Sequence, residues 1–161
     1  MTHTIENKYL GELRTESTHL KSSKTITTDA PKDNNGLGNA FSPTDLVSSA
    51  LCSCITTIMG ICAKKNNFIL PKSTSFITKT MSSNPRRISK ISVEINFETN
   101  NLSEKQIKKL IKVAKGCPVA KSLSSDLIQE INYNFWKFFS ICKIYYGELE
   151  NKFSFFCKRI H

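Results

Sequence analysis

Alternating apolar and polar residues, many of them Thr and Ser, mark the N-terminal part of the chain at 8–29. A period of two is typical of strands that bury one face, so this segment predicts two or three short antiparallel strands joined by tight turns. A loop dense in Pro, Gly, Asn and Asp follows at 30–43. The chain is therefore expected to open with a small sheet.

A helical period replaces this alternation at Ser42, and a long helix is predicted from Pro43 to about Lys65. Serine is a preferred N-cap, proline suits the first helical position, and Asp45 lies where the helix dipole favours an anion. A stripe of apolar residues at helical spacing is expected to face the core, with Cys54 in its middle. The stripe consists of Leu46, Ala50, Cys54, Ile58 and either Ile61 or Cys62.

Further strands and helices are predicted over the rest of the chain. Apolar residues alternate at 72–81, 87–98 and 127–135, which indicates three more strands. A helix opens on a capping-box pattern at Ser103, and a short helix is predicted to begin at Pro118.

The chain has 161 residues with 23 Lys and Arg against 13 Asp and Glu, a net charge of +10. This length suits one domain with a proper core. The charge favours attraction to anions, but no nucleic-acid-binding module is recognised in the sequence. Lysines on the polar side of the helix after Ser103 are interpreted as a solvated face.

The six cysteines are expected to be reduced thiols. The N-terminus lacks the basic and then apolar run of a signal peptide, which predicts a cytoplasmic protein. The longest apolar stretch, 46–63, contains Ser and Thr and is interpreted as a helix surrounded by protein rather than a membrane span. The cysteine and histidine spacings suit no zinc site, so no structural metal site is expected.

Two of the cysteines have surroundings suited to thiol chemistry. Cys117 is predicted at the start of a short helix, where unpaired N–H groups stabilise a thiolate and lower its pKa. Cys54 lies in an apolar stripe that disfavours a thiolate, so it needs a cation or donor from elsewhere in the fold. Arg14 is a candidate, because guanidinium stays charged. The residues alone leave a Cys54–Cys117 redox pair open.

The sequence FSPTDLVSSALCSC, followed further along by CPVAKSL, closely resembles the OsmC/Ohr family of cysteine-based hydroperoxide reductases. In that family, a proline near the start of the central helix precedes the reactive cysteine by eleven residues. Pro43 and Cys54 match that offset, whereas Cys52 does not. The resemblance therefore selects Cys54.

The second family motif is a Cys-Pro pair that opens a short helix, and it matches Cys117 and Pro118. The similarity covers roughly residues 8–135. It implies an α+β OsmC-like fold, with antiparallel sheets around the long central helix in an intertwined homodimer. The domain is accordingly assigned to 1–135, and the aromatic-rich segment 136–161 to a C-terminal extension outside the core fold.

The resemblance implies a thiol peroxidase of the oxidative stress response. Cys54 would be peroxidatic, reducing an organic hydroperoxide to an alcohol and becoming a sulfenic acid. Cys117 would resolve it as a Cys54–Cys117 disulfide, which a dithiol donor such as a lipoyl protein would reduce. The family needs no cofactor, and neither nucleic acid nor a membrane is expected as a partner. Arg14 is assigned to the family arginine that activates the first cysteine.

One position departs from the family pattern. Family peroxidases carry a glutamate directly after the helix-start proline, where it pairs with the arginine, whereas this chain has Thr44. Asp45, one position on, is the candidate substitute as the partner of Arg14. Two alternative functions remain: an OsmC-like stress protein with little peroxidase activity that binds small molecules or thiols, and a basic module that binds anions or nucleic acid.

Overall fold

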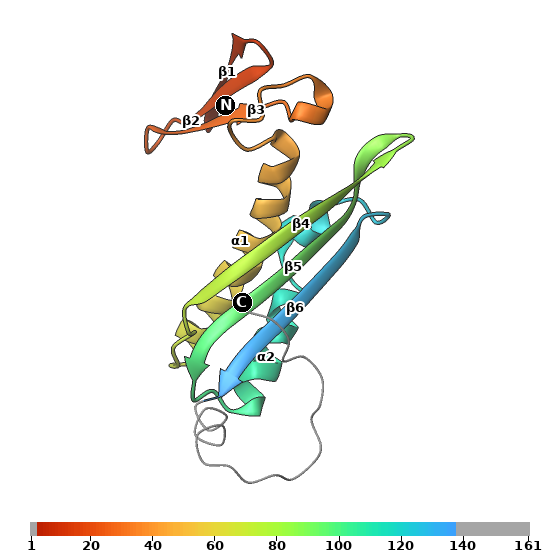
Figure 1. Ribbon diagram of the computed structural model, residues 1–161. Coiled ribbons are helices and arrows are strands. Elements are labelled where there is room, and N and C mark those ends of the chain that lie inside the picture. The colour runs from red at the N-terminus through yellow and green to blue at the C-terminus, as the bar shows by residue number, and fades with distance from the viewer. Residues whose placement is uncertain (1–2, 138–161) are drawn as a thin grey trace.

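The computed structural model describes residues 3–137, which form two three-stranded sheets, a long helix and two shorter helices (Figure 1). The expected extension at 136–161 lies outside the described residues except for Trp136 and Lys137. These two residues continue the last strand, so the strand ends two residues later than expected.

The first sheet is antiparallel in the order β1 (Ile5–Gly11), β2 (Arg14–His19) and β3 (Lys24–Asp29), as the alternation predicts. Most of its side chains are exposed, and only Thr28 and Asp29 in β3 are fully buried. The sheet therefore has no hydrophobic core of its own within one chain.

The long helix α1 (Pro43–Lys65) has the predicted bounds, because its start is well capped. Ser42 and Asp45 form a reciprocal capping box, and Pro43 occupies the first turn. By length and composition α1 would pass as a membrane span, but it packs against α2, α3 and β4 as a core helix.

The expected apolar stripe of α1 is confirmed only in part, since Cys54 and Ile58 pack against the core and Cys62 is buried. The buried side carries Leu51, Ile55 and Met59, each at most 2% exposed, whereas Ala50 and Ile61 are exposed. The helix is apolar on nearly all sides, so helical spacing alone does not tell which side its own chain covers.

The second sheet has the order β4 (Ser73–Ser83), β5 (Arg86–Asn100) and β6 (Ile128–Lys137). Strands β4 and β5 form an antiparallel hairpin, but β6 runs parallel to β5, which corrects the expectation of antiparallel sheets. The reason is the connection: α2 (Glu104–Ala114) and α3 (Pro118–Ser122) carry the chain back along the sheet before β6 starts.

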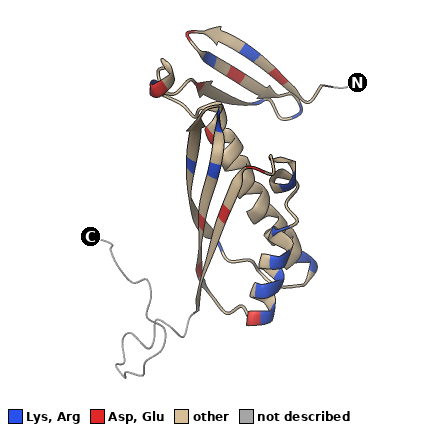
Figure 2. Ribbon diagram, turned by 90° about the vertical axis from the view of Figure 1, so that its right-hand side faces the viewer, with Lys and Arg blue, Asp and Glu red and all other residues tan. Residues whose placement is uncertain are grey.

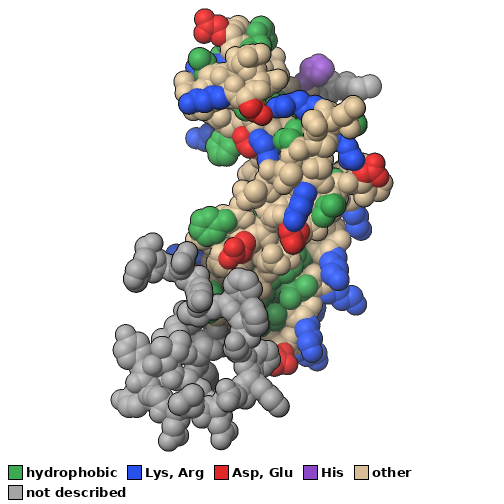
Figure 3. Space-filling model, turned by 45° about the vertical axis from the view of Figure 1, so that its right-hand side comes forward, with side chains coloured by type: hydrophobic (Ala, Val, Ile, Leu, Met, Phe, Trp, Pro, Cys, Tyr) green, Lys and Arg blue, Asp and Glu red, His purple; other side chains and the backbone are tan. Residues whose placement is uncertain are grey.

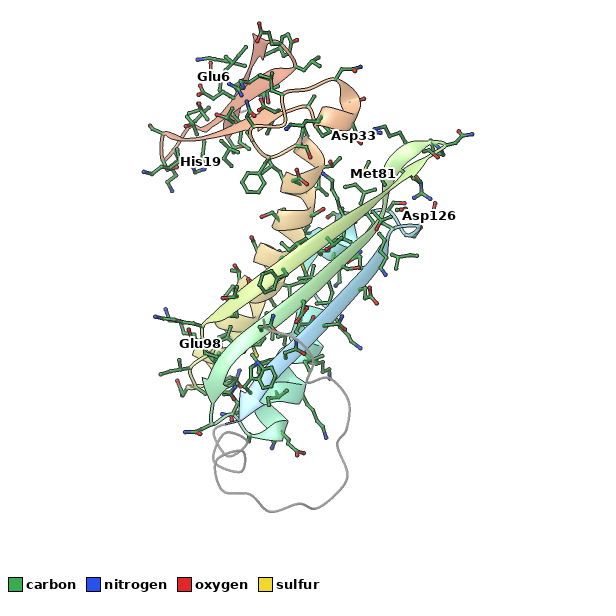
Figure 4. All side chains as sticks on the ribbon, viewed as in Figure 1. Glu6, His19, Asp33, Met81, Glu98 and Asp126 are labelled. Atoms are coloured by element: carbon green, nitrogen blue, oxygen red, sulfur yellow. The ribbon has the colours of Figure 1, made fainter. Side chains whose placement is uncertain are left out.

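The two sheets lie at different places along α1. The first sheet lies beyond the N-terminal end of the helix, whereas the second covers its middle and C-terminal part (Figure 1). Asp33, in the loop after β3, faces the hairpin on which Met81 lies (Figure 4), and Arg86 of that hairpin pairs with Asp33 at 3.3 Å. Both partners are exposed, so this contact holds the first sheet only weakly.

Candidate active site

The structure brings Cys54 and Cys117 together although they are 63 positions apart in the sequence. Cys54 lies in the middle of α1 and is half-buried, and Cys117 is the N-cap of α3 and is fully buried. The two side chains lie close enough for Cys54 to raise the pKa of Cys117, and both sulfurs are unbridged. Helices α1 and α3 contact each other, so the fold itself holds the thiols side by side.

The pKa of the Cys117 thiol lies above its ordinary value, opposite to the expectation from its place at a helix start. Burial is the largest cause, and the neighbouring Cys54 adds to it. The amide N–H of Ala120 donates to the Cys117 sulfur at 3.4 Å and lowers the pKa, but this effect is smaller than the other two. A five-residue helix with a buried start therefore does not produce a thiolate here.

Tyr133 is a neighbour of the thiols that the sequence did not indicate. It lies on β6 opposite Ile95 and packs against the hydrophobic core. Burial raises the pKa of its hydroxyl, and the nearby Cys117 and Cys52 raise it further. The alternation of β6 could have shown that Tyr133 faces the core, but no local pattern places it near the cysteines.

The start of α1 carries a polar cluster of Ser42, Asp45 and Lys79. The ammonium of Lys79, on β4, donates to the Ser42 hydroxyl at 2.8 Å and forms an ion pair with Asp45. Burial acts to raise the pKa of Asp45, but hydrogen bonds from Lys79 and Ser42 outweigh it and place the pKa below its ordinary value. Within one chain, Asp45 thus has Lys79 as its partner rather than Arg14.

Arg14 on β2 forms a bidentate ion pair with Asp29 on the neighbouring strand β3, with N···O distances of 2.7 and 2.9 Å. The hydrogen bond from Arg14 is the main cause that lowers the pKa of Asp29 and raises that of Arg14. Cys54 is twelve residues beyond the N-cap Ser42, about 18 Å along the helix at 1.5 Å per residue. Activation of Cys54 by Arg14 stays a prediction.

Two cavities open near the N-terminal end of α1. One of about 500 Å³ is lined by Phe41, Asp45 and Ile77 among others, and the second, of about 430 Å³, by Tyr9, Thr44 and Met81 among others. Neither is lined by Cys54 or Cys117. Over residues 3–137, no group of His, Cys, Asp and Glu side chains is arranged to hold a metal ion.

Comparison with known proteins gives a consistent family. A family model described as OsmC-like protein matches residues 36–131. A solved structure from Psychrobacter arcticus, whose proposed role is in osmotic stress and detoxification, shares 41% sequence identity with a TM-score of 0.79. The match covers 83% of this chain and 97% of that one.

More distant structures share the fold. The OsmC-like protein of Mycoplasma pneumoniae has a TM-score of 0.70 at 22% identity, covering 84% of this chain and 98% of that one. An organic hydroperoxide resistance protein from Legionella pneumophila has a TM-score of 0.62 at 15% identity, covering 83% and 98%. No curated protein matches the chain at a significant level.

Proposed function

Because the chain belongs to the OsmC-like protein family, we propose that it is a thiol peroxidase that reduces organic hydroperoxides in the cytoplasm. The observation that carries this proposal is the proximity of Cys54 and Cys117, on two helices that contact each other. Core packing alone accounts for one buried cysteine. It does not account for two unbridged thiols from distant segments that interact with each other, one of them partly open to solvent.

In the first step, the Cys54 thiolate attacks the terminal oxygen of the hydroperoxide. The O–O bond breaks, the alcohol leaves with a proton, and Cys54 becomes a sulfenic acid. The apolar neighbours of Cys54 in the core favour alkyl or lipid hydroperoxides over hydrogen peroxide. Cys54 takes this role rather than Cys117, because Cys117 is fully buried and its pKa is raised.

In the second step, the sulfur of Cys117 attacks the sulfur of the sulfenic acid. The S–O bond breaks, water leaves with the thiol proton, and a Cys54–Cys117 disulfide forms. A dithiol donor then reduces this disulfide by exchange and is itself oxidised to a disulfide. The contact between α1 and α3 supports the second step, since it keeps the resolving sulfur beside the reacting one.

A homodimer is part of the proposal. In one chain α1 exposes Ala50 and Ile61 on one side, and the first sheet exposes Tyr9 and Ile26. A second copy would cover these apolar surfaces, as a helix that is apolar on nearly all sides requires. In that arrangement, Arg14 of one copy would supply the positive charge that stabilises the Cys54 thiolate of the other.

The experiment that tests the function is hydroperoxide consumption with a dithiol. Cumene hydroperoxide and dithiothreitol are supplied, and wild type is compared with Cys54→Ser and Cys117→Ser. Loss of turnover in Cys54→Ser is expected, together with a Cys117→Ser variant that forms a stable sulfenic acid. Cys62→Ser is the matched control, because Cys62 is a buried cysteine of the same helix.

Two outcomes would contradict the proposal. Equal turnover in wild type and Cys54→Ser would remove Cys54 from the chemistry. No turnover in folded wild type with titratable thiols would favour the alternative, an OsmC-like stress protein that binds small molecules or thiols without reducing peroxides. In that case Thr44→Glu is the first variant to restore activity, because Thr44 occupies the position of the family glutamate.

A further inference from the structure

The positive charge of the molecule is concentrated in one segment. Residues 1–41 contain five basic and five acidic residues, so they carry no net charge. Residues 101–122 contain six lysines and one glutamate, which leaves +5 of the chain's +10. Figure 2 shows this contrast, with mixed colours on the first sheet and blue gathered on α2.

Helix α2 presents its lysines on one side. Successive residues of a helix are rotated by 100°. The lysines of α2, together with its C-cap Lys115, therefore fall within an arc of about 120° around the helix axis. The buried Leu110 and Ala114 lie on the opposite side. We call the arc of lysines the lysine surface; its members, all exposed, are Lys105, Lys108, Lys109, Lys112 and Lys115. In Figure 3 lysine and arginine side chains line the lower right edge of the molecule.

The lysine surface lies close to Cys117 along the chain. Cys117 follows Lys115 by two positions, and Lys121 lies on the other side of Cys117 in α3. Lys109 also donates a hydrogen bond to Asn66, the C-cap of α1, so the surface is joined to the helix that carries Cys54. A solvated helix face accounts for the exposure of these lysines, but not for a net charge of +5 in the segment that carries Cys117.

We infer that the lysine surface binds an acidic protein that carries the reducing dithiol. This inference rests on the proposed function and names the partner of its last step. A neutral hydroperoxide gains nothing from five ammonium groups, whereas an acidic carrier is attracted and oriented by them. Orientation is needed, because Cys117 is fully buried and the disulfide is reached only through Cys54.

The lysine surface suits a protein better than a lipid bilayer. Helices that lie on membranes insert an apolar face between the lipids. The apolar side of α2 is already buried in the core, so its exposed side offers charge alone. Separate ammonium groups on flexible stems suit carboxylates presented by a protein surface.

The test uses the full-length protein and two synthetic peptides that carry dihydrolipoyl-lysine, one with six aspartates and one with six asparagines. The protein is first oxidised with one equivalent of cumene hydroperoxide. We expect the acidic peptide to reduce the disulfide about tenfold faster than the neutral one at low salt. The advantage should disappear at 0.5 M salt, because screening shortens the reach of the charges.

A matched pair of triple variants locates the effect. Lys105→Gln, Lys108→Gln and Lys112→Gln together should remove most of the acidic peptide's advantage and leave reduction by dithiothreitol unchanged. The control removes the same charge from the first sheet through Lys8→Gln, Lys21→Gln and Lys24→Gln, and should keep the advantage. Equal rates for the two peptides, or equal losses in the two variants, would overturn the inference.

Binding measurements separate this inference from the proposed function. Anisotropy of the acidic peptide, labelled with a fluorophore, reports binding to the lysine surface even if no disulfide forms. Thiol titration after addition of the hydroperoxide reports the chemistry alone. Tighter lysine-dependent binding to phosphatidylglycerol vesicles or to duplex DNA than to the acidic peptide would overturn the assignment of a protein partner.

Discussion

The first sheet differs in burial and in charge from the unit that α1 forms with the second sheet. The first sheet is short, rich in Thr, electrically balanced and exposed on most of its residues. The other unit buries Leu51, Met59 and Phe97 to 1% exposure or less and carries the thiol pair and most of the charge.

This difference shows that a single chain forms a hydrophobic core around α1 and the second sheet but leaves the first sheet without one. The unit around α1 has a core that accounts for its stability, whereas the first sheet is joined to it through a loop and one exposed ion pair. Arg14, the residue assigned to activation, lies on the first sheet. The chemistry is therefore expected to depend on a surface that a second copy provides.

The largest effect is expected from a cavity in the core of the α1 unit. Met59→Ala removes a side chain with 0% exposure and should lower the free energy of unfolding by about 2–5 kcal/mol. Thr25→Ala, at an exposed position of β3, is the matched change in the first sheet and should cost less than about 1 kcal/mol. Urea unfolding followed by circular dichroism, at one protein concentration, gives both values. Similar losses would mean that the two halves do not differ as described.

The second effect concerns the exposed side of α1. Ala50→Glu places a charge on that side, and in a symmetric dimer it does so twice, so the dimer should weaken about 100-fold. Light scattering across a dilution series measures the dissociation constant. Asn101→Glu, an exposed loop position, should leave it unchanged. A monomeric wild type, or a variant that dimerises as well as wild type, would contradict the proposed dimer.

The third prediction uses the raised pKa of Cys117. Because burial and Cys54 hold the proton on this thiol, its titration midpoint should lie above pH 9.0, the ordinary value. Cys54→Ala removes the second of these causes and should move the midpoint toward 9.0. The Cβ chemical shift of Cys117, followed by NMR across the pH range, needs no reagent to reach the buried sulfur and separates Cys117 from the other thiols. A midpoint below 9.0 would mean that the amide of Ala120 outweighs burial.

The sequence was informative where local chemistry decides the structure. The N-cap serine Ser42, followed by Pro43 and Asp45, predicted the start of α1, and the resemblance selected two thiols that the fold places together. Three features depend on contacts between distant segments: the parallel direction of β6, the ion pair of Lys79 with Asp45, and the burial that raises the pKa of Cys117. No local pattern contains these contacts, so sequence reasoning missed them.

The smallest effect is expected within the first sheet, at its one buried charge. The ion pair with Arg14 lowers the pKa of Asp29 below its ordinary 3.8, so its contribution to stability is complete above that pH. The contribution is lost as the pH falls from 3.8 through the lower pKa of the folded protein. Asp29→Asn should remove this acid-dependent loss, which the amide of Asn39 reports, since it donates to Asp29 at 3.0 Å.

Hydrogen exchange at Asn39, expressed as a protection factor between pH 5 and pH 2.5, measures this loss in wild type. Asp33→Asn is the matched control, because Asp33 is an exposed acid of the same region and its pair with Arg86 is solvated. If wild type and Asp29→Asn lose protection in parallel, the ion pair does not hold the loop to the sheet. A loss confined to wild type and the control would show that the ion pair of Asp29 with Arg14, the residue assigned to activation, stabilises this half of the chain within a single copy.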